Sequence, residues 1–184
     1  MSDVRSHFPG AQSDWARFDG PAGTQMVDVS IRAASDWSAS GNNANTHGAF
    51  AQAHATDALL ERARGVVATL LDADPRGVCF GANMTTMTFA LTRAIARTLR
   101  PGDRIVGTQL DHDANVSPWR IACEESGAEH VLAPFSVPDG RLDMNALASL
   151  ITINTKWVAV TGASNLIGTM PDLRAVVSLA RHVG

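Results

Sequence analysis

The chain has 184 residues, of which 45% are hydrophobic and 18% charged, with a formal net charge of -3. This length and composition predict one folded domain, or one domain with part of another, and exclude a chain that is disordered by composition. The slightly acidic balance argues against a nucleic-acid partner or an anionic membrane surface, because both favour a basic face.

Cysteine usage and the N-terminal sequence bear on location. Only two cysteines occur, Cys79 and Cys123, without the CxxC spacing of zinc or redox motifs. We therefore expect no disulfide framework and no metal site, and a cytoplasmic location. The N-terminus lacks the apolar core of a signal peptide, and no run approaches the roughly 18 apolar residues of a membrane span.

Hydrophobic spacing predicts the order of helices and strands. The first twenty residues are polar and aromatic by turns, and a Gly/Pro loop, FDGPAGTQ, follows them. Thr56 and Asp57 form the expected N-cap of the clearest helix. In chain order, the expected elements are helices over 26–38 and 56–71, a strand over 77–80, a helix over 85–99, a strand over 104–108, a helix over 118–126, a strand over 129–134, a helix over 143–151, a strand over 156–162 and a helix over 172–182.

Short apolar strands that alternate with helices indicate βαβ units, in which helices cover both faces of a parallel sheet. The expected fold class is therefore α/β, a three-layer α/β/α arrangement with a mostly parallel sheet. Such sheets bind ligands at the carboxyl ends of their strands. The three motifs described next each follow a predicted strand, so we expect them to share one site.

The first motif is GANMTTMTF, which follows the predicted strand 77–80 and opens a helix. A loop of small residues at a helix start leaves backbone N–H groups that can hold a phosphate. Asn83, Thr85 and Thr86 could add side-chain donors. The alternative is an ordinary strand-to-helix turn with polar caps.

The second motif is LDHDANVSPW, in which Asp111 and Asp113 flank His112. Three such residues could belong to a metal site, but consecutive loop residues rarely converge on one ion and no second histidine cluster is evident. A solvated polar loop is the other alternative.

The third motif, VTGASNLIG, is similar to the TGxxxGIG turn of short-chain dehydrogenases, which leaves an NAD(P)-binding oxidoreductase domain as an alternative. Two features count against it. Leu166 stands where a glycine must let the dinucleotide approach, and the motif follows the fourth predicted strand instead of the first.

Taken together, the motifs resemble those of the class V aminotransferase and cysteine desulfurase-like family of fold type I pyridoxal-phosphate enzymes. LDHDANVSPW resembles the family's E-H-H-x-N-x-x-P-W element, and the resemblance implies that His112 stacks on the ring of pyridoxal 5'-phosphate. ASNLIG resembles its S-N-x-x-G segment and implies that Asn165 reaches the ring's phenolic oxygen. GANMTTMTF resembles the GATEAINL element and implies that Asn83, Met84 and Thr85 hold the phosphate, with Met84 contributing its backbone.

The same resemblance extends to the N-terminal part of the chain. FDGPAGTQ and the loop over 42–50 are similar to the family's substrate-side elements, which makes Thr24, Asn45 and His47 candidates for the substrate rim; as isolated residues they fit turns and caps. The implied organisation is an N-terminal segment over 1–20, from the small domain or an interface arm, and the first part of the cofactor-binding large domain over 21–184.

Two residues that pyridoxal-phosphate enzymes need are not evident. These are the lysine that binds the cofactor as a Schiff base and the acidic residue on the ring nitrogen. The single lysine, Lys156, falls at the amino end of a predicted strand, away from the expected site. The expectation is an N-terminal fragment, inactive alone, of a homodimeric enzyme that acts on an amino acid by sulfur or selenium removal or by transamination. A non-catalytic remnant or interaction module remains an alternative.

Overall fold

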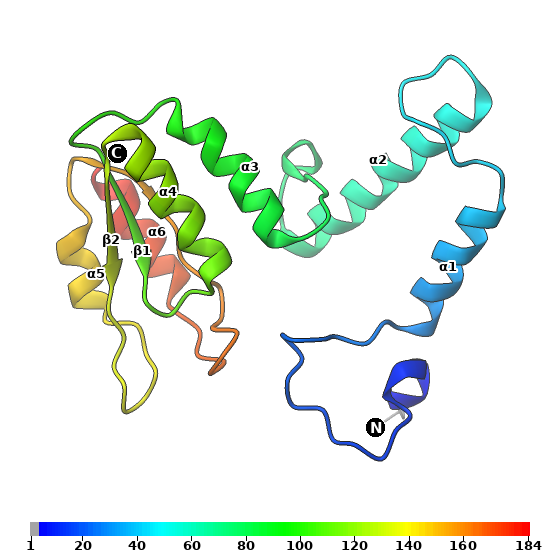
Figure 1. Ribbon diagram of the computed structural model, residues 1–184, viewed down its shortest axis with the longest axis horizontal. Coiled ribbons are helices and arrows are strands. Elements are labelled where there is room, and N and C mark those ends of the chain that lie inside the picture. The colour runs from blue at the N-terminus through cyan, green and yellow to red at the C-terminus, as the bar shows by residue number, and fades with distance from the viewer. Residues whose placement is uncertain (1–3) are drawn as a thin grey trace. The chain divides into compact units, whose positions relative to one another are not determined.

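The computed structural model describes residues 4–184, which form two compact units that divide between Phe80 and Gly81 (Figure 1). The division predicted at residue 20 concerns the domains of a whole enzyme and stays a prediction. No helix within residues 4–184 is long and apolar enough to cross a membrane.

The first unit is helical. It contains η1 (Val4–His7), η2 (Pro9–Ala11), α1 (Asp28–Ala39), α2 (Ala51–Leu71) and η3 (Pro75–Gly77).

The N-cap predicted at Thr56 and Asp57 is wrong, because α2 begins five residues earlier, at Ala51. Both side chains instead hold the preceding loop against the helix. The Thr56 hydroxyl donates to the Ala44 carbonyl at 3.1 Å, and the Asp57 carboxylate accepts from the His47 N–H at 3.2 Å. Tertiary hydrogen bonds therefore use the residues whose chemistry suggested a cap.

The strand predicted over 77–80 is also wrong. Asp74 accepts a hydrogen bond from the Arg76 N–H at 2.8 Å and starts η3, after which the chain continues without strand pairing. Val78 is buried, but Cys79 and Phe80 are exposed. A run of four apolar residues is too short for periodicity to separate a strand from a loop.

The second unit is an α/β fold, as predicted. Its elements are α3 (Met84–Ala96), β1 (Arg104–Thr108), η4 (Asp113–Asn115), α4 (Ser117–Ser126), β2 (Glu129–Ala133), α5 (Met144–Leu150), β3 (Thr155–Val158) and α6 (Leu173–His182). The strands form a parallel sheet in the order β2-β1-β3, with Val106 opposite both Val131 and Val158.

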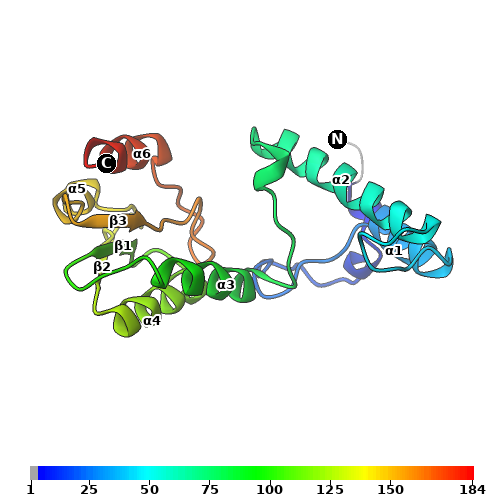
Figure 2. The ribbon, with the colours of Figure 1, turned by 90° about the horizontal axis from the view of Figure 1, so that it is seen from above.

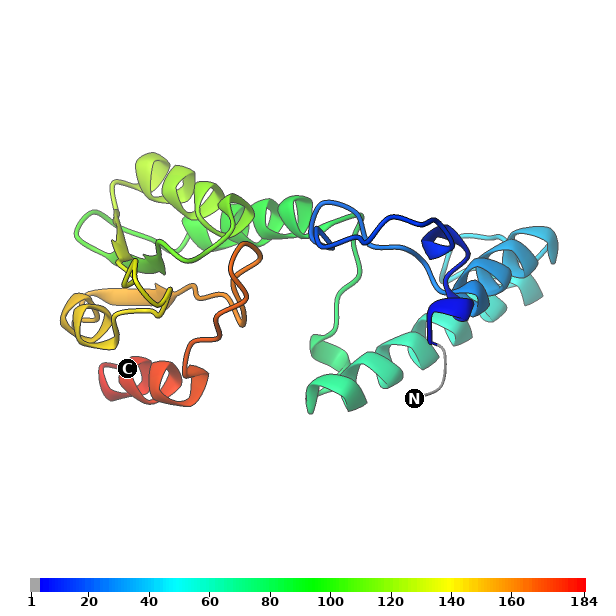
Figure 3. The ribbon, with the colours of Figure 1, turned by 90° about the horizontal axis from the view of Figure 1, so that it is seen from below.

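Helices cover both faces of this sheet, which gives the three predicted layers (Figures 2 and 3). Neighbouring residues of β1 point to opposite faces, and Ile105 and Val106 are both fully buried. Ile105 packs with Ile95 of α3 and Trp119 of α4, whereas Val106 packs with α5 and α6.

Local capping marks where α5 and α6 begin. The Asp143 carboxylate accepts from the Asn145 and Ala146 N–H groups at 3.0 and 2.9 Å, and Asp172 accepts from the Ala175 N–H at 3.0 Å. Each cap contributes about 1 kcal/mol. The helices predicted from residues 143 and 172 are therefore confirmed, with the aspartates just outside them.

His130 of β2 is a polar side chain in an unfavourable position. Its Nε2 is buried and has no hydrogen-bond partner within residues 4–184. A methyl group at Gly107 would lie 3.3 Å from this nitrogen, so the histidine packs closely over the glycine of β1. Burial, and then the nearby charge of Arg120, lower the pKa of His130 below its ordinary value of 6.5.

We predict that His130 makes the second unit sensitive to acid. Because folding lowers the pKa of His130, the unfolded chain binds a proton near pH 6.5, whereas the folded chain binds it only at a lower pH. The free energy of unfolding therefore falls as the pH drops below 6.5. His130→Leu should flatten this dependence and, by removing the unpaired nitrogen, stabilise the fold at neutral pH by about 1 kcal/mol. Urea unfolding at a series of pH values measures both effects. His182→Leu, at the exposed end of α6, is the matched control and should keep the steep dependence; equal curves for the two variants would contradict the prediction.

The two thiols should differ in reactivity. Cys123 is only 2% exposed, and burial together with Glu124 raises its pKa to about 11, whereas Cys79 is exposed. Because the thiolate is the reactive form, we expect iodoacetamide at neutral pH to label Cys79 in the native protein and Cys123 only after denaturation. Peptide mass spectrometry distinguishes the two sites, and rapid native labelling of Cys123 would show that α4 opens readily.

Candidate functional site

Two candidate residues follow neighbouring parallel strands. β1 and β3 are hydrogen-bonded partners. His112 comes four residues after Thr108, the last residue of β1, and Asn165 lies in the loop that follows β3. Because parallel strands end at the same edge of a sheet, both segments leave from its carboxyl edge. Figure 2 shows the loop after β3, in orange, at the end of the sheet toward the start of α3.

His112 is held by the turn that it begins. It is the N-cap of η4, and its Nδ1 accepts a hydrogen bond from the Ala114 N–H at 3.0 Å. Its carbonyl accepts from the Asn115 N–H at 2.8 Å. Since Nδ1 is an acceptor, the proton of the neutral ring belongs on Nε2, on the opposite side of the imidazole. The side chain is nonetheless exposed.

The aspartates beside His112 have separate partners. The Asp111 carboxylate accepts hydrogen bonds from Thr108 and Asn115, whereas Asp113 accepts from the Ser117 hydroxyl at 2.7 Å. No group of three His, Cys, Asp or Glu side chains in the described part of the chain is arranged to hold a metal ion. The carboxylates serve to fold the turn.

Asn165 lies in a tight loop that Ser164 stabilises. Ser164 is buried; its N–H donates to the Thr169 carbonyl at 2.9 Å, and its carbonyl accepts from the Gly168 N–H at the same distance. Gly168 has a φ of 74°, which glycine adopts without strain. The Asn165 carboxamide is exposed and bonds to no other group within residues 4–184. It is therefore available to a ligand.

The start of α3 provides donors for an anion. The Asn83 side chain accepts from the Thr86 N–H at 2.8 Å, so it caps the helix. The N–H groups of Met84 and Thr85 precede the first helical hydrogen bonds, and the first turn contains no acidic residue. All three predicted residues are exposed. This donor set fits a phosphate.

The direction of α3 places these donors toward the same edge. Ile95, near the end of α3, packs in the same cluster as Ile105, near the beginning of β1. The helix therefore ends toward the amino edge of the sheet and begins toward the carboxyl edge. It also packs against η4, the turn that carries His112.

The three predicted substrate-side residues belong to the first unit. The Thr24 hydroxyl donates to the Gly20 carbonyl at 2.9 Å, which makes it a turn residue. Asn45 is exposed, and His47 has a φ of 63° with its N–H bonded to Asp57. Their place at a substrate rim stays a prediction.

Lys156 lies where the sequence predicted, near the amino end of β3. Its side chain is 49% exposed, and its Nζ is 3.8 Å from the Asp103 carboxylate. It therefore lies at the opposite edge of the sheet from the segments that carry His112 and Asn165.

The candidate site also depends on buried residues that none of the sequence motifs identified. Thr108, fully buried at the end of β1, bonds to Asp111, and Ser164 anchors the Asn165 loop. The spacing of Asp111, Asn115 and Trp119, four residues apart each time, was a signal that their side chains could meet along one face.

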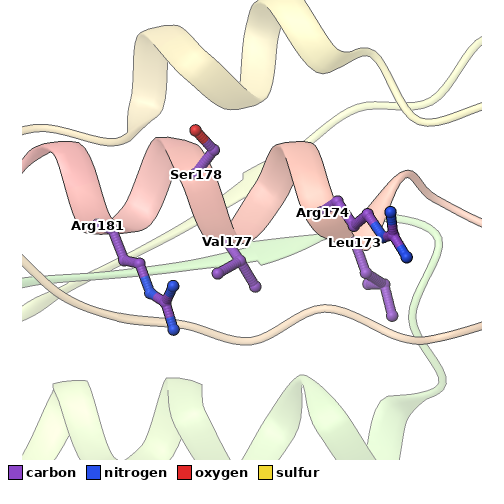
Figure 4. A pocket seen from close by; sticks show the side chains of 5 residues that line it. All are labelled: Leu173, Arg174, Val177, Ser178 and Arg181. Atoms are coloured by element: carbon purple, nitrogen blue, oxygen red, sulfur yellow. The ribbon is translucent and has the colours of Figure 1, made fainter.

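A hollow on the surface of α6 is lined by Leu173, Arg174, Val177, Ser178 and Arg181 (Figure 4). None of the predicted site residues lines it, so it is separate from the candidate site.

Proteins of similar sequence align with much or all of this chain. An uncharacterized protein of Mycobacterium tuberculosis is 35% identical over 185 residues, which cover 100% of this chain and 46% of the relative. A cysteine desulfurase of Salmonella gallinarum is 36% identical over 109 residues, or 59% of this chain and 25% of that protein. The chain spans about half the length of the first of these relatives.

Solved structures show the same fold. The apo cysteine desulfurase of Thermococcus onnurineus NA1 matches with a TM-score of 0.88 at 22% identity, over 99% of this chain and 45% of that one. The cysteine desulfurase CsdA of Escherichia coli matches with a TM-score of 0.83 at 27% identity, over 98% and 45%. These likenesses support a fold type I architecture over the dinucleotide-binding alternative.

The sequence model for the family described as aminotransferase class-V matches residues 17–184, which is nearly the whole chain. This match includes the loop over 42–50, the start of α3 and the segments that carry His112 and Asn165. The chain therefore belongs to the aminotransferase class-V family, as its motifs predicted.

Proposed function

We propose that this chain carries part of the cofactor site of a pyridoxal 5'-phosphate enzyme of the cysteine desulfurase-like kind, which acts on an amino acid. The observation that carries the proposal is the placement of His112 and Asn165 after the carboxyl ends of β1 and β3, two neighbouring parallel strands. Family membership and the cysteine desulfurases among the relatives support it.

The start of α3 would hold the cofactor phosphate. A phosphate carries negative charge that the N–H groups of Met84 and Thr85 and the positive end of the helix dipole can stabilise. The Met84 side chain offers no useful donor, so its contact would come from the backbone. Asn83 would act by capping the helix, since its side-chain oxygen accepts from Thr86.

His112 and Asn165 would hold the cofactor ring. The His112 imidazole is exposed, and the Ala114 N–H fixes one of its nitrogens, so it can lie against a flat ring without a large loss of side-chain freedom. The Asn165 carboxamide can donate to a phenolic oxygen. When bound, pyridoxal 5'-phosphate supplies an electron sink for the substrate's α-carbon.

The single lysine and the buried cysteine of this chain do not suit the chemistry. Lys156 lies at the wrong edge of the sheet, and Cys123 is buried with a pKa raised to about 11, so neither serves as the cofactor lysine or a sulfur-accepting thiolate. We propose that the 184 residues alone are inactive. Sulfur removal, selenium removal and transamination all remain compatible with the site.

Titration followed by NMR tests the cofactor proposal. Addition of pyridoxal 5'-phosphate to the isotope-labelled chain should shift the backbone amides of Met84 and Thr85 and the side-chain signals of His112 and Asn165. Pyridoxal without its phosphate should leave the two amides unchanged, because they respond to the anion. His112→Ala should weaken binding by about fivefold, in line with roughly 1 kcal/mol for an aromatic contact.

His54→Ala, on the exposed surface of α2, is the control and should bind as tightly as the unchanged chain. Shifts at the four residues with NAD but none with pyridoxal 5'-phosphate would favour the oxidoreductase alternative. No shift with either ligand would favour the non-catalytic interaction module.

We also propose, from the family resemblance, that the whole enzyme is a cytoplasmic homodimer. Large exposed apolar side chains support self-association, among them Trp15 and Phe18, which are 82% and 95% exposed. Sedimentation velocity at low micromolar concentration should show species larger than 19.4 kDa, and Trp15→Ser with Phe18→Ser should reduce them. A sharp 19.4 kDa monomer for the unchanged chain would contradict self-association through these residues.

A further inference from the structure

We infer that Asp111 and Asn115 are positioning residues, whose side chains bridge over His112 and hold its imidazole in the tautomer protonated on Nε2. The use of His112 at a cofactor rests on the function proposed above. The bridge itself is a property of the described residues, so it can be tested without any ligand.

The bridge is one continuous chain of hydrogen bonds. The Thr108 hydroxyl donates to one carboxylate oxygen of Asp111, and the other oxygen accepts from the Asn115 amide at 2.7 Å. The Asn115 carbonyl oxygen accepts from the indole N–H of Trp119 at 3.1 Å. Asp111 and Asn115 each have a partner on both sides, and the direction of donation is fixed because the indole can only donate.

Both ends of this chain are anchored in the protein interior. Thr108 is fully buried at the end of β1, and its hydroxyl also accepts from the Leu110 N–H at 3.2 Å. Trp119 is 4% exposed and stacks on Trp157 with ring centres 6.1 Å apart. The bridge therefore ties the sheet to α4 across the turn that carries His112.

The bridge encloses the turn that carries His112. Residues 111 and 115 lie on either side of the histidine, so their bond closes the turn in which the Ala114 N–H meets Nδ1 at 3.0 Å. While that contact lasts, Nδ1 must keep its lone pair and Nε2 must carry the proton. Opening the bridge frees the Ala114 N–H and allows the imidazole to turn or to change tautomer.

The outer bond of the same turn provides a contrast. Asp113 accepts from the Ser117 hydroxyl at 2.7 Å, but this pair is exposed and is not connected to Thr108 or Trp119. If any polar bond in the turn were sufficient to fix His112, Asp113 would matter as much as Asp111. We expect instead that only the pair of Asp111 and Asn115 fixes the imidazole.

A charge exchange tests the inference in the full 184-residue chain without cofactor. Asn115→Asp places a second carboxylate against Asp111, and the two repel. Asp111→Asn combined with Asn115→Asp restores a complete chain, because Asn at 111 can accept from Thr108 and donate to Asp at 115, which still accepts from Trp119. Asp113→Asn is the matched control.

Two measurements report on His112 itself. Long-range proton–nitrogen correlation at about pH 8, above the ordinary titration range of imidazole, identifies the tautomer, with His112→Gln assigning the signal. Hydrogen exchange measures the protection of the Ala114 amide. Asn115→Asp should mix the tautomers and speed the exchange by about tenfold. The double variant should return to within about twofold of the unchanged chain, and Asp113→Asn should match it.

Thr108→Val is the second variant, for use if Asn115→Asp does not fold. It keeps the side-chain shape but removes the buried hydroxyl, and it should also mix the tautomers and speed the exchange of the Ala114 amide. A folded Asn115→Asp or Thr108→Val variant with an unchanged tautomer and unchanged exchange would overturn the inference, as would a double variant that folds but is not restored. Failure to bind pyridoxal 5'-phosphate with the tautomer pattern intact would count against the proposed function alone.

Discussion

The parallel pairing of β1 with its two neighbours is the constraint on which the second unit depends. Ile105 and Val106 are fully buried on opposite faces of the sheet, so this one strand joins the core under α3 and α4 to the core under α5 and α6. Because β2 and β3 run in the same direction as β1, the segments that follow the strands all leave from one edge. The parallel sheet therefore brings the segments with His112 and Asn165 to one edge, where the cofactor site is proposed.

The polar residues at this edge of the sheet fall into two groups. Thr108, Asp111 and Ser164 have their hydrogen-bonding capacity used within the protein, and they shape the loops. His112 and Asn165 are exposed at the positions so shaped. Exposed groups on a firmly held backbone are what a cofactor site requires, because binding then costs little conformational entropy.

The sequence predicted the second unit more accurately than the first, for physical reasons. Residues 104–108 pair with strands on both sides, so their apolar run had a single interpretation, and the prediction matched β1. Residues 77–80 have a similar composition but no strand partner, which no local pattern reveals. Thr56 looked like a cap because its chemistry suits one, whereas a contact with Ala44, twelve residues away, decided its role. The carboxyl-edge location of His112 and Asn165 followed from alternation alone, but the bridge from Thr108 to Trp119 depends on side-chain geometry.

A crystal structure of the chain with pyridoxal 5'-phosphate would show whether these 184 residues carry part of the cofactor's site. We expect the phosphate within hydrogen-bonding distance of the Met84 and Thr85 N–H groups, the ring against the His112 imidazole and the phenolic oxygen beside Asn165. A ligand bound at the amino edge of the sheet, for instance on Lys156, with the carboxyl edge empty, would contradict this expectation.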